Sequence, residues 1–203
     1  MTAEVHVVQH DSPEVVGRRQ RLGVILLILA DVAFVLSLVF AYLYLHGLDT
    51  EGGWLPQDGP AALGAGFGWV IAAVMLVSWA AYRWAETAAR AGQRERLVLG
   101  VLAAVVLVTV DLALQVYQMA TAGFVVADGS YASAFMALAG YHVFHLALTA
   151  FLGIGIANRA RLGRFDTDAW HVRLVGYWWN WVALSAILTA ATTSLTASPH
   201  AGS

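Results

Sequence analysis

The chain contains no cysteine and no lysine, and only 12% of its 203 residues are charged. The absence of cysteine excludes a disulfide framework and a thiolate metal site. A soluble domain of this length is about 25% charged and about 45–50% apolar. The low charge, together with a hydrophobic content of 60%, therefore indicates an integral membrane protein. The N-terminal segment lacks the cationic start and cleavage site of a signal peptide, so we expect the first apolar segment to remain in the mature protein.

Five apolar stretches are long enough to cross a membrane, because a transmembrane helix needs about 20 predominantly apolar residues. We predict an all-α polytopic bundle of five transmembrane helices within residues 22–196, preceded by an N-terminal segment at 1–21 and followed by a tail at 197–203. No period of about 20–50 residues recurs, which disfavours a solenoid and an inverted-repeat transporter. The predicted helices are 22–46, 63–84, 97–121, 131–158 and 172–196.

The cationic residues are all arginines, and all 11 fall on one side of the predicted helices. They precede the first helix or lie between the second and third, or the fourth and fifth, helices. By the positive-inside rule we predict that the N-terminal segment is cytoplasmic and that the tail lies outside. Some tryptophans lie near predicted helix ends, where indole rings favour the headgroup region. These are Trp54, Trp69, Trp84, Trp170 and Trp178.

A few polar residues inside the predicted helices are candidate functional residues, because ionisable side chains are costly within a membrane. They are Asp31 in the first helix, Asp111 in the third, and His142 and His145 in the fourth. Gln115 follows Asp111 by one helical turn and shares its face. At a rise of about 1.5 Å per residue, Asp111 and His142 lie at similar depths. We therefore expect the polar faces to meet in one bundle interior, with Asp–His contacts.

The spacing of His142 and His145 has three interpretations. A metal or haem site is one, but a single helix supplies only two ligands, and helical carboxylate sites usually add several glutamates. A proton relay through Asp31, Asp111 and the histidines is another. The third, which the pattern favours, is a polar seam that sets helix register or holds lipid headgroups. Hydrogen bonds of this kind contribute about 0.6 kcal/mol each in membranes, so they specify geometry more than they stabilise.

Glycines in the fourth predicted helix offer a different kind of contact. Glycine lets the backbones of two membrane helices approach closely. We expect Gly140, Gly153 and Gly155 to serve helix packing.

Motifs in the predicted helices follow one another in a characteristic order. The first helix opens with Arg-Leu-Gly at 21–23 and carries Asp31, and the fourth reads SAFMALAGYHVFHLAL, with Gly140, His142 and His145. This order resembles subunit III of the haem–copper respiratory oxidases, in the five-helix form found in bacteria. Asp31 then occupies the place of the family's membrane-embedded glutamate. The fourth helix matches the family's Thr-Gly-Phe-His-Gly-x-His element at Gly140, His142 and His145, with Ala139 in place of the threonine and Val143 in place of the second glycine.

The resemblance also identifies departures that mark a divergent member. Gln115 matches the family's third-helix glutamine, whereas other positions differ. Gln118 stands where the family has glutamate, Asn180 where it has histidine, and Ala183 where it has aspartate.

The resemblance implies a non-catalytic accessory subunit of an oxidoreductase complex in aerobic respiration, with no redox centre or metal of its own. It implies haem and copper in a partner catalytic subunit I, and a further partner subunit II. It also implies a phospholipid near Asp31, His142 and His145, with Asp111 and Gln115 close by, and a role in proton uptake and complex stability. The expected location is a bacterial plasma membrane, and no nucleic-acid partner is expected. Two alternatives remain open: an accessory subunit of a quinol oxidase or nitric oxide reductase, and a small proton or solute transporter.

Overall fold

The computed structural model describes residues 13–50, 53–54, 65–165 and 169–196, which form five α-helices and one 3-10 turn, with no strand among them. Each α-helix is long and apolar enough to cross a membrane. The prediction of an all-α bundle of five transmembrane helices is therefore confirmed. The elements are α1 Pro13–Gly47, α2 Ala65–Arg90, α3 Arg94–Ala120, η1 Val126–Asp128, α4 Ser130–Arg161 and α5 Trp170–Leu195.

Helix α1 begins at Pro13, nearer the N-terminus than the expected start at residue 22. Hydropathy marks only the apolar part of a helix, whereas the polar residues before it continue the same backbone hydrogen bonding. Part of the predicted N-terminal segment is thus helical. Residues 1–12 of that segment and the predicted tail at 197–203 lie outside the described residues.

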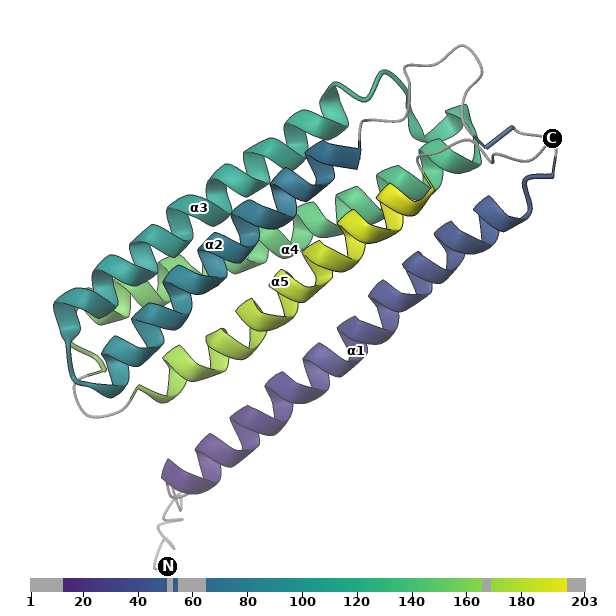
Figure 1. Cartoon of the computed structure of the whole chain (residues 1–203). Helices are drawn as coiled ribbons and strands as arrows, with labels where there is room; N and C mark the ends of the chain where they lie inside the picture. Colours follow the sequence, from purple (N-terminus) through teal and green to yellow (C-terminus); the bar gives the residue numbers. More distant parts are fainter. Residues whose placement is uncertain (1–12, 51–52, 55–64, 166–168, 197–203) are drawn as a thin grey trace, which may run out of the picture.

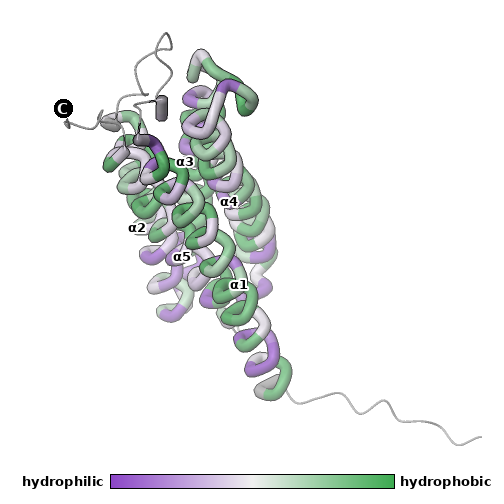
Figure 2. The backbone as a smooth tube through the Cα atoms, turned by 90° about the vertical axis from the view of Figure 1, so that its right-hand side faces the viewer, coloured by the Kyte–Doolittle hydropathy of each residue, from purple (hydrophilic) through white to green (hydrophobic). Residues whose placement is uncertain are grey.

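Four of the helices form a ring, and the fifth lies outside it. In the ring, α2 packs against α3 and α5, and α4 packs against the same two helices. Of the four other α-helices that the structure describes, α1 packs against α4 and α5 alone, and Figure 1 shows it running along the outside of the bundle. Much of its apolar surface is exposed, and Figure 2 shows it as hydrophobic along most of its length. The ring and the α1 face of α4 and α5 are therefore two separate packing regions.

The arginines gather at one end of the bundle, which we call the arginine end. It comprises the start of α1, the α2–α3 turn, the end of α4 and the start of α5, which Figure 1 shows together. In the α2–α3 turn, Gly92 has a φ of +67°, a conformation that glycine adopts without strain. Arg94 then donates from Nε to the Ala160 carbonyl at 3.1 Å and from Nη2 to the Arg161 carbonyl. It thereby satisfies carbonyl groups that the end of α4 leaves without helical partners.

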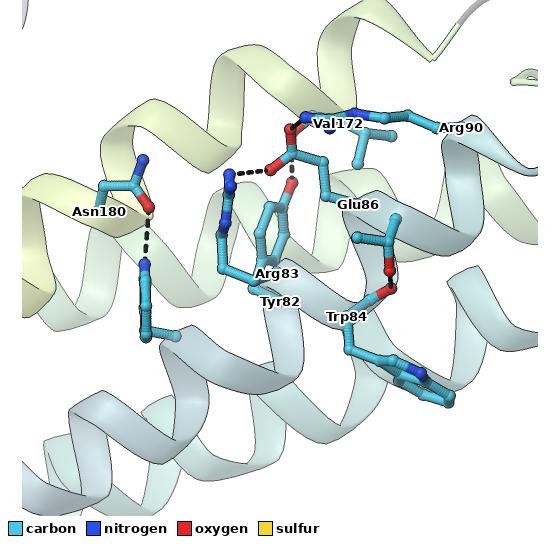
Figure 3. A network of polar contacts seen from close by, with 9 residues as sticks. Tyr82, Arg83, Trp84, Glu86, Arg90, Val172 and Asn180 are labelled. Atoms are coloured by element: carbon cyan, nitrogen blue, oxygen red, sulfur yellow. Dashed lines mark hydrogen bonds and ion pairs between the residues drawn. The ribbon is translucent and has the colours of Figure 1, made fainter.

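A buried carboxylate lies where α2 meets α5 near the arginine end. Glu86 is only 3% exposed, and it accepts hydrogen bonds from Arg83 at 2.5 Å and from Arg90, as Figure 3 shows. The neighbouring Tyr82 hydroxyl donates to the Val172 carbonyl of α5 at 2.9 Å. Because a buried charge needs nearby opposite charge, the two arginines make this packing of α2 against α5 possible.

The glycines of α4 differ in what surrounds them. A Cβ atom at Gly153 would come within 2.5 Å of Val105 on α3, so this glycine permits close approach of the two helices. At Gly140 a Cβ would make an ordinary 3.7 Å contact with Met119, and at Gly155 it would meet nothing within 4 Å. Gly155 therefore does not provide the close helix contact that we expected of it, because a Cβ at this position would face open space. Gly100 of α3 does permit close approach, since its Cβ would lie 2.8 Å from Ala85.

We predict that Gly153→Ala lowers the free energy of unfolding by about 1–3 kcal/mol, the usual cost of forcing a methyl group into a packed interior. The matched control is Gly155→Ala, two residues away on the same helix, which has room for the methyl group. Both variants share the gain in helix propensity, so their difference isolates the steric effect. Unfolding in detergent micelles measures it, and equal stability of the two variants would contradict the close approach of α3 and α4.

Candidate functional site

A single carboxylate oxygen joins three helices on the α1 face of α4 and α5. Oδ2 of Asp31 accepts a hydrogen bond from Nε2 of His145 on α4 at 2.7 Å and one from the indole nitrogen of Trp181 on α5 at 2.5 Å. The His145 side chain is 1% exposed and that of Asp31 is 13% exposed. The predicted Asp–His contact therefore forms between α1 and α4, and Trp181 adds α5 to it. We call Asp31, His145 and Trp181 the polar junction.

The imidazole of His145 is held from several sides. The rings of Tyr141 and Trp178 pack edge-on against it, with centroids 4.3 Å and 5.4 Å away. Thr149 donates to the His145 carbonyl at 2.6 Å and accepts from the Trp178 indole at 2.9 Å. Ser185 Oγ lies 3.5 Å from Nδ1. These contacts fix the ring orientation that presents Nε2 to Asp31.

The residues 178–181 of α5 connect it to every helix around it. Trp178 and Trp179 are buried, at 4% and 0% exposure. Each of these four residues makes one hydrogen bond to another helix: Trp178 to Thr149 of α4, Trp179 to Ser78 of α2, Asn180 to Trp79 of α2, and Trp181 to Asp31 of α1. Ser78 also donates to the Ala104 carbonyl of α3 at 2.8 Å, which extends the connection to that helix.

Trp178 therefore lies inside α5 and not near a helix end, contrary to expectation, and Trp54 is buried at 5% exposure. Trp69 and Trp84 are each 45% exposed. Closeness to a predicted helix end is a weak guide to depth, because α5 begins at Trp170 and places residue 178 two turns inside the helix.

The spacing of polar residues in the sequence gives no indication that Trp181 belongs to the polar junction. The indole N–H of a buried tryptophan needs a hydrogen-bond acceptor, and this requirement is the feature of the sequence that could have identified Trp181 as a partner of a buried carboxylate.

His142 and Asp111 lie apart from the polar junction. Three residues advance a helix by about 300°, so His142 points about 60° away from His145. His142 is 2% exposed and Asp111 is 0% exposed. Within the described part of the chain, neither ring nitrogen of His142 and neither carboxylate oxygen of Asp111 has a hydrogen-bonding partner. The expected meeting of all polar faces in one interior is thus not what the structure shows.

Gln115 and Gln118 pair with each other on α3. Nε2 of Gln115 donates to Oε1 of Gln118 at 2.8 Å, and both side chains are buried. They lie with His142 around a small cavity inside the ring of α2–α5. Of the predicted site residues, the structure therefore groups Asp31 with His145, and Gln115 with His142.

An apolar groove of about 600 Å³ lies toward the arginine end, between α1, α4 and α5. Val24 and Leu27 of α1 form one wall, and Phe151 and Gly155 of α4 contribute to another. Trp178, which packs against His145, also lines the groove. Arg159 and His171 are its polar lining residues near the arginine end, together with Asn158.

No group of three or more histidine, aspartate or glutamate side chains that could hold a metal ion occurs in residues 13–50, 53–54, 65–165 and 169–196. The metal-site interpretation of the two histidines therefore finds no ligand set there.

Comparison with known proteins relates almost the whole chain to one family. Residues 2–188 match the family model described as cytochrome c oxidase subunit III. Among curated proteins, the chain is 30% identical over 167 residues to cytochrome c oxidase subunit 3 of Marchantia polymorpha, covering 80% of the chain and 63% of the relative. The protein of that name from Triticum aestivum is 29% identical over 179 residues, covering 81% and 66%. The Cyprinus carpio protein is 26% identical over 187 residues, covering 87% and 71%. The chain thus spans just under two thirds of the length of the first two relatives.

We predict that Asp31 and Trp181 are energetically coupled. In a double-mutant cycle of Asp31→Ala and Trp181→Phe, the coupling energy should be about 0.6 kcal/mol, and at most about 1.7 kcal/mol, as for other hydrogen bonds within membranes. Trp179→Phe serves as the control, because the Trp179 indole donates to Ser78 on the other side of α5. Unfolding of the single and double variants in micelles gives the coupling. A value no larger than that of Asp31 with Trp179 would contradict the junction.

Proposed function

Because the chain belongs to the cytochrome c oxidase subunit III family, we propose that it is a non-catalytic accessory subunit of a haem–copper terminal oxidase. The observation that carries this proposal is the match of residues 2–188 to the family model. In this function the partner catalytic subunit holds the haem and copper, a second partner subunit completes the core, and the present chain contributes packing. The arginine end faces the cytoplasm of a bacterial cell, in keeping with the positive-inside rule.

The second part of the proposal is that the groove between α1, α4 and α5 binds a phospholipid. An apolar groove of about 600 Å³ suits acyl chains. Arg159 lines it near the arginine end, where a cation can attract a lipid phosphate at the membrane surface. The guanidinium of Arg159 also lies 5.5 Å from the centre of the Phe165 ring, a contact that restricts its position.

Such a lipid would support the polar junction through Trp178. The junction does not itself line the groove; Trp178 stands between, with one edge against His145 and a surface toward the groove. Helix α1 depends on α4 and α5 for its packing, and its wall of the groove is formed by Val24 and Leu27. A lipid in the groove would fill the space between α1 and these helices. We propose that in this way it supports the stability of the complex and, through it, proton uptake by the catalytic subunit.

The accessory function predicts that the tagged full-length chain, purified in mild detergent, brings with it a larger subunit that accounts for all the haem in the optical spectrum. Native mass spectrometry would identify the subunits together with the haem type, and the electron donor would distinguish a cytochrome c oxidase from a quinol oxidase or a nitric oxide reductase. The chain purified alone with stoichiometric haem would contradict the proposal. Proton flux into liposomes that contain this chain alone, abolished by Asp31→Asn, would instead establish a transporter.

The lipid site predicts that Gly155→Phe reduces the phospholipid retained by the purified chain. Gly155 lines the groove, and no protein atom lies within 4 Å of the position its Cβ would take, so the phenyl ring starts from open space and extends into the volume proposed for the lipid. Gly66→Phe is the control, since Gly66 on α2 also has open space around it but does not line the groove. Native mass spectrometry counts the bound lipids. Equal retention by the two variants would place the lipid elsewhere, whether or not the chain is an oxidase subunit.

A further inference from the structure

A small cavity lies inside the ring of α2–α5, away from the groove and from the polar junction. Its volume is about 20 Å³, and all four ring helices line it. A cavity must offer about 10–15 Å³ to hold one water molecule, so this space is large enough for a water and too small for a lipid chain. Its polar lining residues are Gln115 and Gln118 of α3, His142 of α4, and Thr189 and Thr193 of α5.

His142 is the group in this cavity that most needs a ligand. Its side chain is among the most completely buried in the protein, and neither ring nitrogen is hydrogen-bonded to another described residue. A neutral imidazole has one donor nitrogen and one acceptor nitrogen. Leaving a buried donor or acceptor unsatisfied costs about 1–3 kcal/mol, which is why such groups in folded proteins are paired with protein or with ordered water.

The other polar groups around the cavity can complete the coordination of a water. The hydrogen bond between the two glutamines uses one amide N–H of Gln115 and the side-chain carbonyl oxygen of Gln118. The side-chain carbonyl oxygen of Gln115 and the amide N–H groups of Gln118 take no part in it. The Thr193 hydroxyl donates to the Thr189 carbonyl at 3.0 Å, so its oxygen remains an acceptor. An internal water typically makes about three hydrogen bonds, and this lining offers donors and acceptors from three helices.

We propose that the ring of α2–α5 contains an internal water site in which a water molecule is hydrogen-bonded to His142 and to polar groups of α3 and α5. The two histidines of the fourth transmembrane helix then have different partners. His145 is satisfied by the carboxylate of Asp31, which ties α1 to the bundle, and His142 is satisfied by water, which links α4 to its ring neighbours. This site is independent of the oxidase assignment, because it lies entirely within the present chain.

Solid-state NMR of the full-length chain in lipid bilayers, with ¹⁵N-labelled histidine, tests the site directly. The His142 ring signals are assigned by their loss in His142→Leu. We expect a cross-peak between water protons and a His142 ring nitrogen in the unmodified chain. Absence of that cross-peak, or a His142 nitrogen bonded to Asp111 or to a glutamine side chain instead, would overturn the proposal.

Two substitutions at Ala186, which lines the cavity, test where the water sits. Ala186→Val fills the cavity, so the water cross-peak at His142 should be lost while the His145 signals stay unchanged. Ala186→Ser adds one hydroxyl group where Ala186→Val adds two methyl groups. A hydrogen bond to His142 should therefore be preserved in Ala186→Ser. A water cross-peak that survives Ala186→Val unchanged would refute the location.

Thermal unfolding separates the loss of water from simple crowding. If Ala186→Val acts by expelling the water, it lowers the unfolding midpoint in the native chain, and it lowers the midpoint much less in a His142→Leu background. Crowding alone would reduce the midpoint equally in both backgrounds, and that outcome would contradict the proposal.

Discussion

Indole N–H groups far from water must find hydrogen-bond acceptors within the protein, and α5 carries three of them within four residues. The acceptors come from different helices: Thr149 of α4, Ser78 of α2 and Asp31 of α1. Ser78 extends the connection to α3 through the Ala104 carbonyl. Each bond is weak by itself, but together they leave α5 few alternative rotations about its axis. The positions of the polar junction and of the ring interior depend on this one helical turn.

The arrangement gives the bundle two polar regions with different character. On the α1 face, Asp31 and His145 satisfy each other directly, and Trp178 separates them from an apolar groove that suits a lipid. Inside the ring, His142 lies at a cavity of about 20 Å³ beside the paired Gln115 and Gln118. Among the described helices, α1 packs against α4 and α5 alone, so its position depends strongly on the polar junction and on what fills the groove. Near its other end, the Tyr42 hydroxyl of α1 also accepts a hydrogen bond from Thr196 at 3.0 Å.

Much of the fold could be predicted from the sequence because crossing a membrane imposes strong local requirements. Five apolar stretches indicated five helices, and arginine placement indicated that the connections alternate between two ends. The candidate site was predicted in part. Depth and residue type identified Asp31 and His145, whereas Asp111 and His142, expected at similar depths, are not hydrogen-bonded to each other. Gly155 also differs from expectation, since a Cβ there would face open space, while Gly153 permits close approach.

Hydropathy and helical period are local properties of the chain, so the amino-acid order predicts the helices, their alternation and the small set of polar residues inside them. Which neighbour each polar side chain meets depends on how the helices pack against one another. His142 and His145 are three residues apart, yet the 60° or so between them directs one into the ring and the other toward α1. Trp181 becomes a partner of Asp31 only because α1 lies against α4 and α5. The rotation of each helix about its own axis is set by packing and hydrogen bonds among all five, and no single segment contains that information.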